Sequence, residues 1–105
     1  MRIDVLYFDE CPNHQPTVER INTILREEGC YAELCEVLVP DVETAQRVKF
    51  LGSPTVRVNG IDIEPTAQNR RDFGLMCRRY IGGTPSQDLI RAAIRSASAY
   101  GGGAR

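Results

Sequence analysis

Four cysteines and one histidine are the side chains whose types could support thiol chemistry in this chain of 105 residues. The thiols are Cys11, Cys30, Cys35 and Cys77, and His14 lies three residues after Cys11. A thiolate is a nucleophile and a ligand for soft metals, and a protonated imidazole beside it lowers the pKa of the thiol. No two cysteines have the C-x2-C spacing of a zinc ribbon or an iron–sulfur site, so we expect no metal centre of that kind. The stretch around Cys11 and His14 is therefore the first place to look for reactivity.

Composition restricts the classes of protein to consider. Hydrophobic residues make up 42% and charged residues 26%, with 13 Lys+Arg against 14 Asp+Glu, and this is ordinary globular usage. We expect one domain over residues 1–100 and a flexible glycine-rich tail over residues 101–105. The net charge of -1 argues against a nucleic-acid binder that neutralises phosphates.

The expected location follows from what the sequence lacks. No apolar run approaches the ~20 residues that cross a bilayer, so we expect no membrane partner. The first residues have no signal-peptide layout. We therefore expect a cytoplasmic protein with reduced thiols rather than a secreted one with two disulfides.

Apolar patterning predicts the element order β-α-β-α-β-β-α. The strongest local signal is Asn59-Gly60 between two alternating runs, which predicts a β-hairpin with a type I′ turn. A β-α-β unit requires parallel strands, so a four-stranded mixed sheet with helices on both faces follows. This α/β layout is the thioredoxin fold. The predicted strands are 2–8, 31–39, 55–58 and 61–64. The first predicted helix starts near Thr17 and ends at Gly29, and the second follows the N-cap Asp41 and ends at Gly52. The third follows the N-cap Thr84.

Two motifs carry a resemblance to a known family. YFDECPNH, residues 7–14, places a cysteine between the first strand and the first helix, and GSPTV, residues 52–56, precedes the hairpin. On these motifs the chain resembles the thioredoxin/glutaredoxin superfamily over residues 2–97. The resemblance implies that Cys11 is the nucleophile and that Pro54 is a cis proline lying against it. It also implies that Pro12, Pro54 and the backbone groups of Ser53 and Thr55 contact an extended substrate.

One position departs from the dithiol members of that superfamily. Their second cysteine stands three residues after the first, and here that residue is His14. The resemblance therefore implies a monothiol, unless a remote thiol such as Cys77, which two arginines flank, resolves the mixed disulfide. We interpret Cys30 and Cys35 as packing residues. An inert buried Cys11 and a His14 that only caps the helix are the structural alternatives.

The start of the first helix decides how strongly its dipole acts on Cys11. A helix that begins at Pro12 places Pro16 in its second turn, where a proline removes a hydrogen bond and clashes. A helix that begins at Pro16 leaves Cys11 in a loop, where the dipole is weaker. We favour a loosened first turn.

These observations predict a thiol–disulfide oxidoreductase that needs no cofactor. Its partners are protein thiols or small thiols such as glutathione, whose carboxylates the arginines near Cys77 would hold, unless those arginines form a solvated face. The alternatives are a soft-metal or organomercurial binder using Cys11 and Cys77, in line with a looser likeness to small proteins grouped near the alkylmercury lyases, and an interaction module without a reactive thiol. The sequence does not fix the oligomeric state.

Overall fold

A strand, a helix and a second strand parallel to the first begin the chain in the computed structural model, which describes residues 1–98. Strand β1 (Arg2–Tyr7) leads through α1 (His14–Glu28) to β2 (Glu33–Leu38). β1 and β2 pair in parallel, with Arg2 opposite Glu33 and Tyr7 opposite Leu38. The predicted tail at residues 101–105 lies outside the described residues.

The hairpin completes a four-stranded mixed sheet in the order β2-β1-β3-β4. β3 (Thr55–Val58) pairs antiparallel with both β1 and β4 (Ile61–Asp62). Asn59 and Gly60 have φ values of 51° and 84°, the positive angles that a type I′ turn requires at both central positions. The predicted hairpin turn is therefore confirmed, although β4 is two residues long instead of four.

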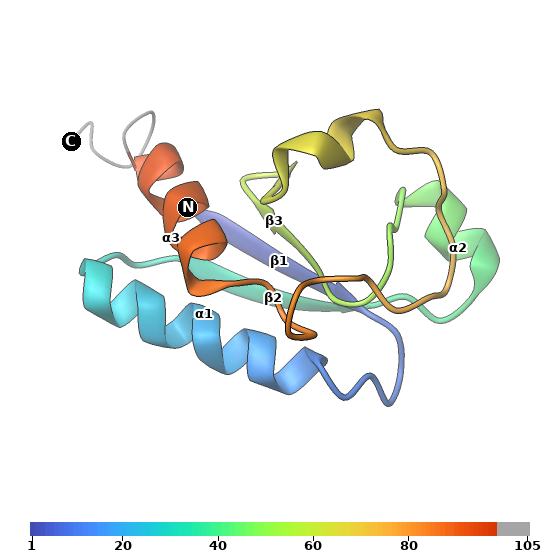
Figure 1. The fold of residues 1–105 in the computed structure, drawn as a ribbon, viewed down its shortest axis with the longest axis horizontal. Helices are drawn as coiled ribbons and strands as arrows, with labels where there is room; N and C mark the ends of the chain where they lie inside the picture. The colour runs from blue at the N-terminus through green and yellow to red at the C-terminus, as the bar shows by residue number, and fades with distance from the viewer. Residues whose placement is uncertain (99–105) are drawn as a thin grey trace.

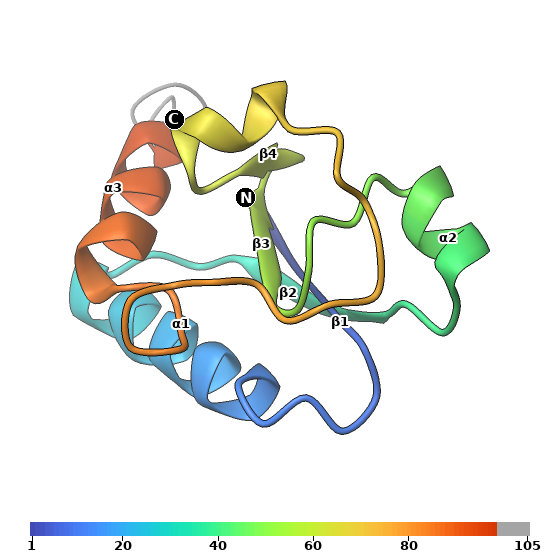
Figure 2. The same ribbon diagram turned by 45° about the vertical axis from the view of Figure 1, so that its right-hand side comes forward.

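Helices cover the two faces of the sheet unequally. α1 and α3 (Gln87–Ala97) lie on one face, and α2 (Val42–Arg47) lies beyond the other, as Figures 1 and 2 show from two sides. Side chains alternate along β1, so Val5 faces α1 and α3, whereas Leu6 faces α2. The larger core joins α1, α3, β1 and β3 through Ile3, Val5, Ile21, Ile24, Val56, Ile90 and Ile94, all at most 1% exposed.

The first helix begins earlier than the apolar spacing indicates. α1 starts at His14, so neither Pro12 nor Pro16 is its first residue. Pro16 is the third helical residue, where the backbone N–H has no partner within the helix and a proline costs nothing. Gly29 ends the helix in the left-handed conformation, with φ at 64°, as predicted.

The second helix ends at Arg47, before the predicted end at Gly52. Asp41 is the N-cap as predicted, and its carboxylate accepts the Thr44 amide at 2.7 Å. At the other end, Lys49 adopts a φ of 59° and the Phe50 amide donates to the Ala45 carbonyl at 2.8 Å. This is the Schellman arrangement that usually needs glycine. It turns the chain so that Phe50, which is 0% exposed, enters the smaller core with Ala45.

The last helix begins at Gln87 with Ser86 as its N-cap, because the Ser86 hydroxyl accepts the Leu89 amide at 3.1 Å. The predicted cap, Thr84, has another role. Its hydroxyl and the carbonyl of Pro85 both accept hydrogen bonds from the Arg20 guanidinium, so they tie the entry of α3 to α1. Residues 65–83 are irregular, as predicted, apart from a 3₁₀ turn at Pro65–Asn69.

An ion-pair cluster joins the end of α1 to α3 and predicts a pH dependence of stability. Hydrogen bonds from Arg95 and Arg91 lower the pKa of Glu28 to about 2. A carboxyl group whose pKa is lower in the folded state stabilises the fold above its unfolded value of about 4.3 and loses that effect as the pH falls. We expect Glu28→Gln to be less stable than the wild type at pH 6 and equally stable near pH 2. Urea unfolding across this range tests it, and a difference that does not change with pH would contradict it.

Within residues 1–98, no helix combines the length and the apolar character needed to span a membrane.

Candidate functional site

Cys11 lies in a tight turn between β1 and α1. Its amide donates to the Phe8 carbonyl at 3.3 Å, and its own carbonyl accepts the His14 amide at 3.3 Å. The residue is 8% exposed and its thiol is free. Cys11 therefore stands at the junction that the sequence indicates, but it is largely covered. Pro12, which follows it, is exposed.

The Ser53–Pro54 loop lies beside this turn. Leu6 pairs with Thr55, and continuing the antiparallel register brings Phe8 to Ser53. The Phe8 amide does donate to the Ser53 hydroxyl, at 3.4 Å. The Ser53–Pro54 peptide bond is cis, as the resemblance implies. The turn that holds Cys11 and the proline loop are thus joined through Phe8 and Ser53.

A second segment of the chain occupies the outer side of the same loop. We call residues 76–78 the Cys77 segment. The Ser53 amide donates to the Met76 carbonyl at 2.8 Å, the Arg78 amide donates to the Ser53 carbonyl at 3.0 Å, and Ser53 and Cys77 form a parallel bridge. Ser53 and Thr55 are 0% exposed. The backbone groups of Ser53 expected to receive a peptide are paired with the chain itself.

The structure therefore brings Cys11 and Cys77 to the same loop from two directions. Cys11 reaches it through Phe8 and the Ser53 hydroxyl, and Cys77 reaches it through the Ser53 backbone. Cys77 is exposed and carries a free thiol. Cys30 and Cys35 are half-buried; Cys30 contacts the Ser98 hydroxyl and Cys35 lies in β2 opposite Asp4.

His14 is held by groups other than Cys11. Its imidazole stacks on the Tyr7 ring, with centroids 3.6 Å apart and planes 9° apart, and its Nε2 lies 2.6 Å from a carboxylate oxygen of Glu36. In residues 1–98 no hydrogen bond joins the His14 side chain to the Cys11 thiol. The imidazole fixes the start of α1 to β1 and β2.

A buried arginine fixes the Cys77 segment, and sequence reasoning missed it. The Arg78 side chain is 1% exposed and donates two hydrogen bonds to Asp62, at 2.7 and 2.9 Å, and others to Glu64 and Thr55. Burial lowers the pKa of Arg78, but the Asp62 and Glu64 carboxylates raise it by more, so the guanidinium stays charged. The charge of Arg78 is therefore paired with Asp62 and Glu64.

Tyr80 extends the same cluster to the proline loop. Its hydroxyl donates to the Pro54 carbonyl at 3.0 Å, and its ring lies 5.2 Å from the Arg78 guanidinium carbon. Burial raises the pKa of Tyr80, so the phenol remains a donor. The sequence does carry a signal for this cluster. Apolar and acidic residues alternate in residues 61–64, so the carboxylates of Asp62 and Glu64 lie on the same side of the hairpin with no cation between them.

The arrangement offers a covered thiol, an exposed thiol and a rigid loop between them. In the part of the chain that the structure describes, no three histidine, cysteine or acidic side chains lie close enough to hold a metal ion. Comparison of the chain with protein-family models, curated proteins and solved structures gave no match.

Proposed function

We propose that the protein is a thioredoxin-fold thiol–disulfide oxidoreductase with Cys11 as its nucleophile. The observation that carries the proposal is the path of contacts from the Cys11 turn through Phe8 and Ser53 to the Cys77 segment. The sheet order β2-β1-β3-β4 and the position of Cys11 between β1 and α1 support the fold assignment. We place it in a reducing compartment such as the cytoplasm, where the four cysteines, free in this structure, remain thiols.

The reaction consists of two displacements on sulfur. The Cys11 thiolate attacks one sulfur of a disulfide, a Cys11–S bond forms, and the other sulfur leaves as a thiolate that takes up a proton. A second thiolate then attacks the mixed disulfide. If it is Cys77, it attacks the Cys11 sulfur, the remaining half of the substrate leaves as a thiolate, and a Cys11–Cys77 disulfide forms. If it is external glutathione, it attacks the substrate sulfur, a disulfide between glutathione and the substrate forms, and Cys11 leaves as the thiolate.

The burial of Cys11 limits which disulfide substrates can reach its sulfur. Cys11 is 8% exposed, and the Ser53 backbone is already paired with Met76 and Arg78. An extended peptide has no free backbone partner at Ser53 unless the Cys77 segment leaves. A small disulfide such as glutathione disulfide makes no such demand. We propose low-molecular-weight thiols and disulfides as the first substrate class.

Single-cysteine replacements test the proposal. We expect Cys11→Ser to abolish glutathione-dependent reduction of a small mixed disulfide, whereas Cys35→Ser, a half-buried thiol in β2, keeps the wild-type rate. We expect Cys77→Ser to accumulate the Cys11 mixed disulfide if Cys77 is the resolving thiol. Coupled consumption of NADPH by glutathione reductase measures the turnover. Equal rates in Cys11→Ser and Cys35→Ser would refute the proposal.

A further inference from the structure

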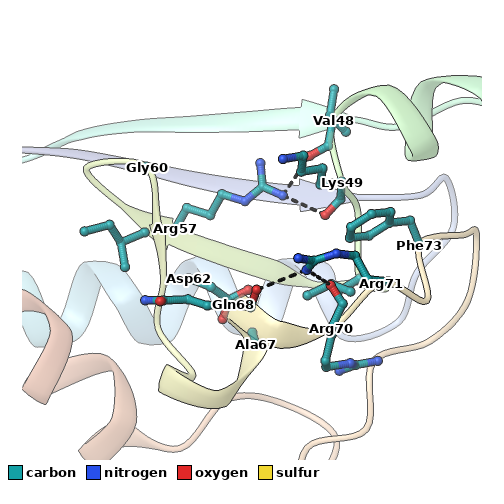
Figure 3. A pocket seen from close by; sticks show the side chains of 12 residues that line it. Val48, Lys49, Arg57, Gly60, Asp62, Ala67, Gln68, Arg70, Arg71 and Phe73 are labelled. Atoms are coloured by element: carbon teal, nitrogen blue, oxygen red, sulfur yellow. Dashed lines mark hydrogen bonds between the residues drawn. The ribbon is translucent and has the colours of Figure 1, made fainter.

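A cavity of about 480 Å³ lies on the sheet face away from α1 and α3. The end of α2, β3, the hairpin turn and residues 67–73 surround it, as Figure 3 shows. Its volume falls in the range of small-molecule sites. Four of its lining side chains are cationic and one, Asp62, is anionic; the cationic ones are Lys49, Arg57, Arg70 and Arg71.

Arg57 on β3 forms one wall without a carboxylate partner. Its in-register neighbours on the two adjacent strands are Asp4 and Asp62. Both carboxylates are bound by other arginines, Asp4 by Arg2 at 2.9 Å and Asp62 by Arg78 at 2.7 Å. Within residues 1–98, no ion pair therefore reaches Arg57, although two acidic residues flank it.

The hydrogen bonds that Arg57 makes leave most of its donors open. Its Nη2 donates to the carbonyls of Val48 and Lys49, at 2.8 and 3.0 Å, and this holds the guanidinium against the turn that follows α2 (Figure 3). Nε and Nη1 have no partner among the described residues. Arg57 is half-buried, and burial lowers its pKa. Arg57 thus lacks full hydration, and neither of the carboxylates that flank it is hydrogen-bonded to it.

Arg71 and Lys49 add two more cations that have no carboxylate partner in the described chain. Arg71 donates from Nη1 to the carbonyls of Gln68 and Arg70, which holds its guanidinium over the cavity. Arg70 differs, because Asp72 neutralises it through two hydrogen bonds. The cavity is thus a local excess of positive charge on a protein whose net charge is -1. A merely solvated arginine face would not include a half-buried member whose neighbouring carboxylates are taken.

We propose that this cavity, the Arg57 cavity, binds a small polyvalent anion that carries phosphate or carboxylate groups. The open Nε and Nη1 of Arg57 point in different directions, so each donates a separate charge-assisted hydrogen bond to an anionic group, and Arg71 and Lys49 neutralise the remaining charge. Phe73 supplies an apolar wall for the carbon skeleton of the ligand. This site is separate from the Cys11 turn and does not depend on the proposed thiol chemistry.

Isothermal titration calorimetry with pyrophosphate and with citrate tests the site in the full chain. We expect binding that weakens by about tenfold or more in Arg57→Met and several-fold in Arg71→Gln. Arg79→Gln removes an exposed arginine outside the cavity and is the matched control, with wild-type affinity expected. Stronger binding of pyrophosphate indicates a phosphate ligand, and stronger binding of citrate indicates a carboxylate ligand.

Two outcomes would overturn the proposal. One is the absence of binding of either anion at millimolar concentration. The other is binding that Arg79→Gln weakens as much as Arg57→Met does, since this indicates diffuse attraction to the surface. If Arg57→Met does not fold, the double variant Lys49→Gln with Arg71→Gln replaces it, because both side chains are exposed and a large loss of affinity is still expected.

Discussion

Replacing Arg78 by methionine is expected to lower the free energy of unfolding by about 3–5 kcal/mol, because it leaves buried carboxylates without their counter-charge. Asp62 and Glu64 each lose two hydrogen bonds, and the Asp62 side chain is only 10% exposed. Thr55 and Tyr80 lose contacts with the same guanidinium. Methionine fills part of the volume, so most of the loss comes from unpaired charge rather than from a cavity.

The adjacent arginine provides the control for this prediction. Arg79 is exposed, and we expect Arg79→Met to change the free energy of unfolding by less than about 0.5 kcal/mol. Urea unfolding monitored by tyrosine fluorescence measures both variants. Similar losses in the two would mean that the Arg78 cluster does not stabilise the fold. Faster hydrogen exchange at the Ser53 amide in Arg78→Met would locate the loosening at the Cys77 segment.

Replacing Gly52 by alanine is the second change expected to have a large effect, a loss of about 2 kcal/mol or more. Gly52 has a φ of 114°, which residues with a side chain rarely adopt. A Cβ there would also lie 3.0 Å from the Arg78 backbone nitrogen and 3.1 Å from the Met76 carbonyl oxygen. These are backbone atoms, so the Cys77 segment must shift away from the proline loop.

A substitution at Gly29 separates the cost of the positive φ from the cost of the steric conflict. It has a φ of 64°, but nothing lies within 4 Å of an added Cβ. We expect Gly29→Ala to cost about 1 kcal/mol from backbone conformation alone. The excess loss in Gly52→Ala then reports the steric conflict with residues 76–78. An equal cost in both variants, measured by urea unfolding, would show that the Cys77 segment moves aside freely.

Local patterns in the sequence were sufficient for the elements whose signals are local. The hairpin follows from Asn59-Gly60, because a type I′ turn needs two residues that tolerate positive φ. The α1 end follows from Gly29 for the same reason. The end of α2 was not predictable in this way. A lysine takes the left-handed position because burying Phe50 favours the turn, and that is a tertiary effect.

The candidate site was predicted in its positions but not in its contacts. The strand–turn–cysteine pattern of the YFDECPNH motif is enough to predict that Cys11 lies between the first strand and the first helix. Sequence order does not show that His14 stacks on Tyr7, or that residues 76–78 pair with Ser53. Ser53 and Met76 are 23 positions apart in the sequence, and the buried Arg78 side chain holds residues 76–78 in place through Asp62 and Glu64. Periodicity carries no information about a buried ion pair between a loop and a hairpin.

Mapping the first site that glutathione disulfide modifies in the reduced, folded protein tests the central claim most directly. Exposure alone favours Cys77, which is exposed, over Cys11, which is 8% exposed. If the Cys11 turn is built for thiol exchange, mass spectrometry of peptides after brief reaction will show glutathione on Cys11 first, or a Cys11–Cys77 disulfide derived from it. Glutathione on Cys77 with Cys11 unmodified until the protein unfolds would contradict the account.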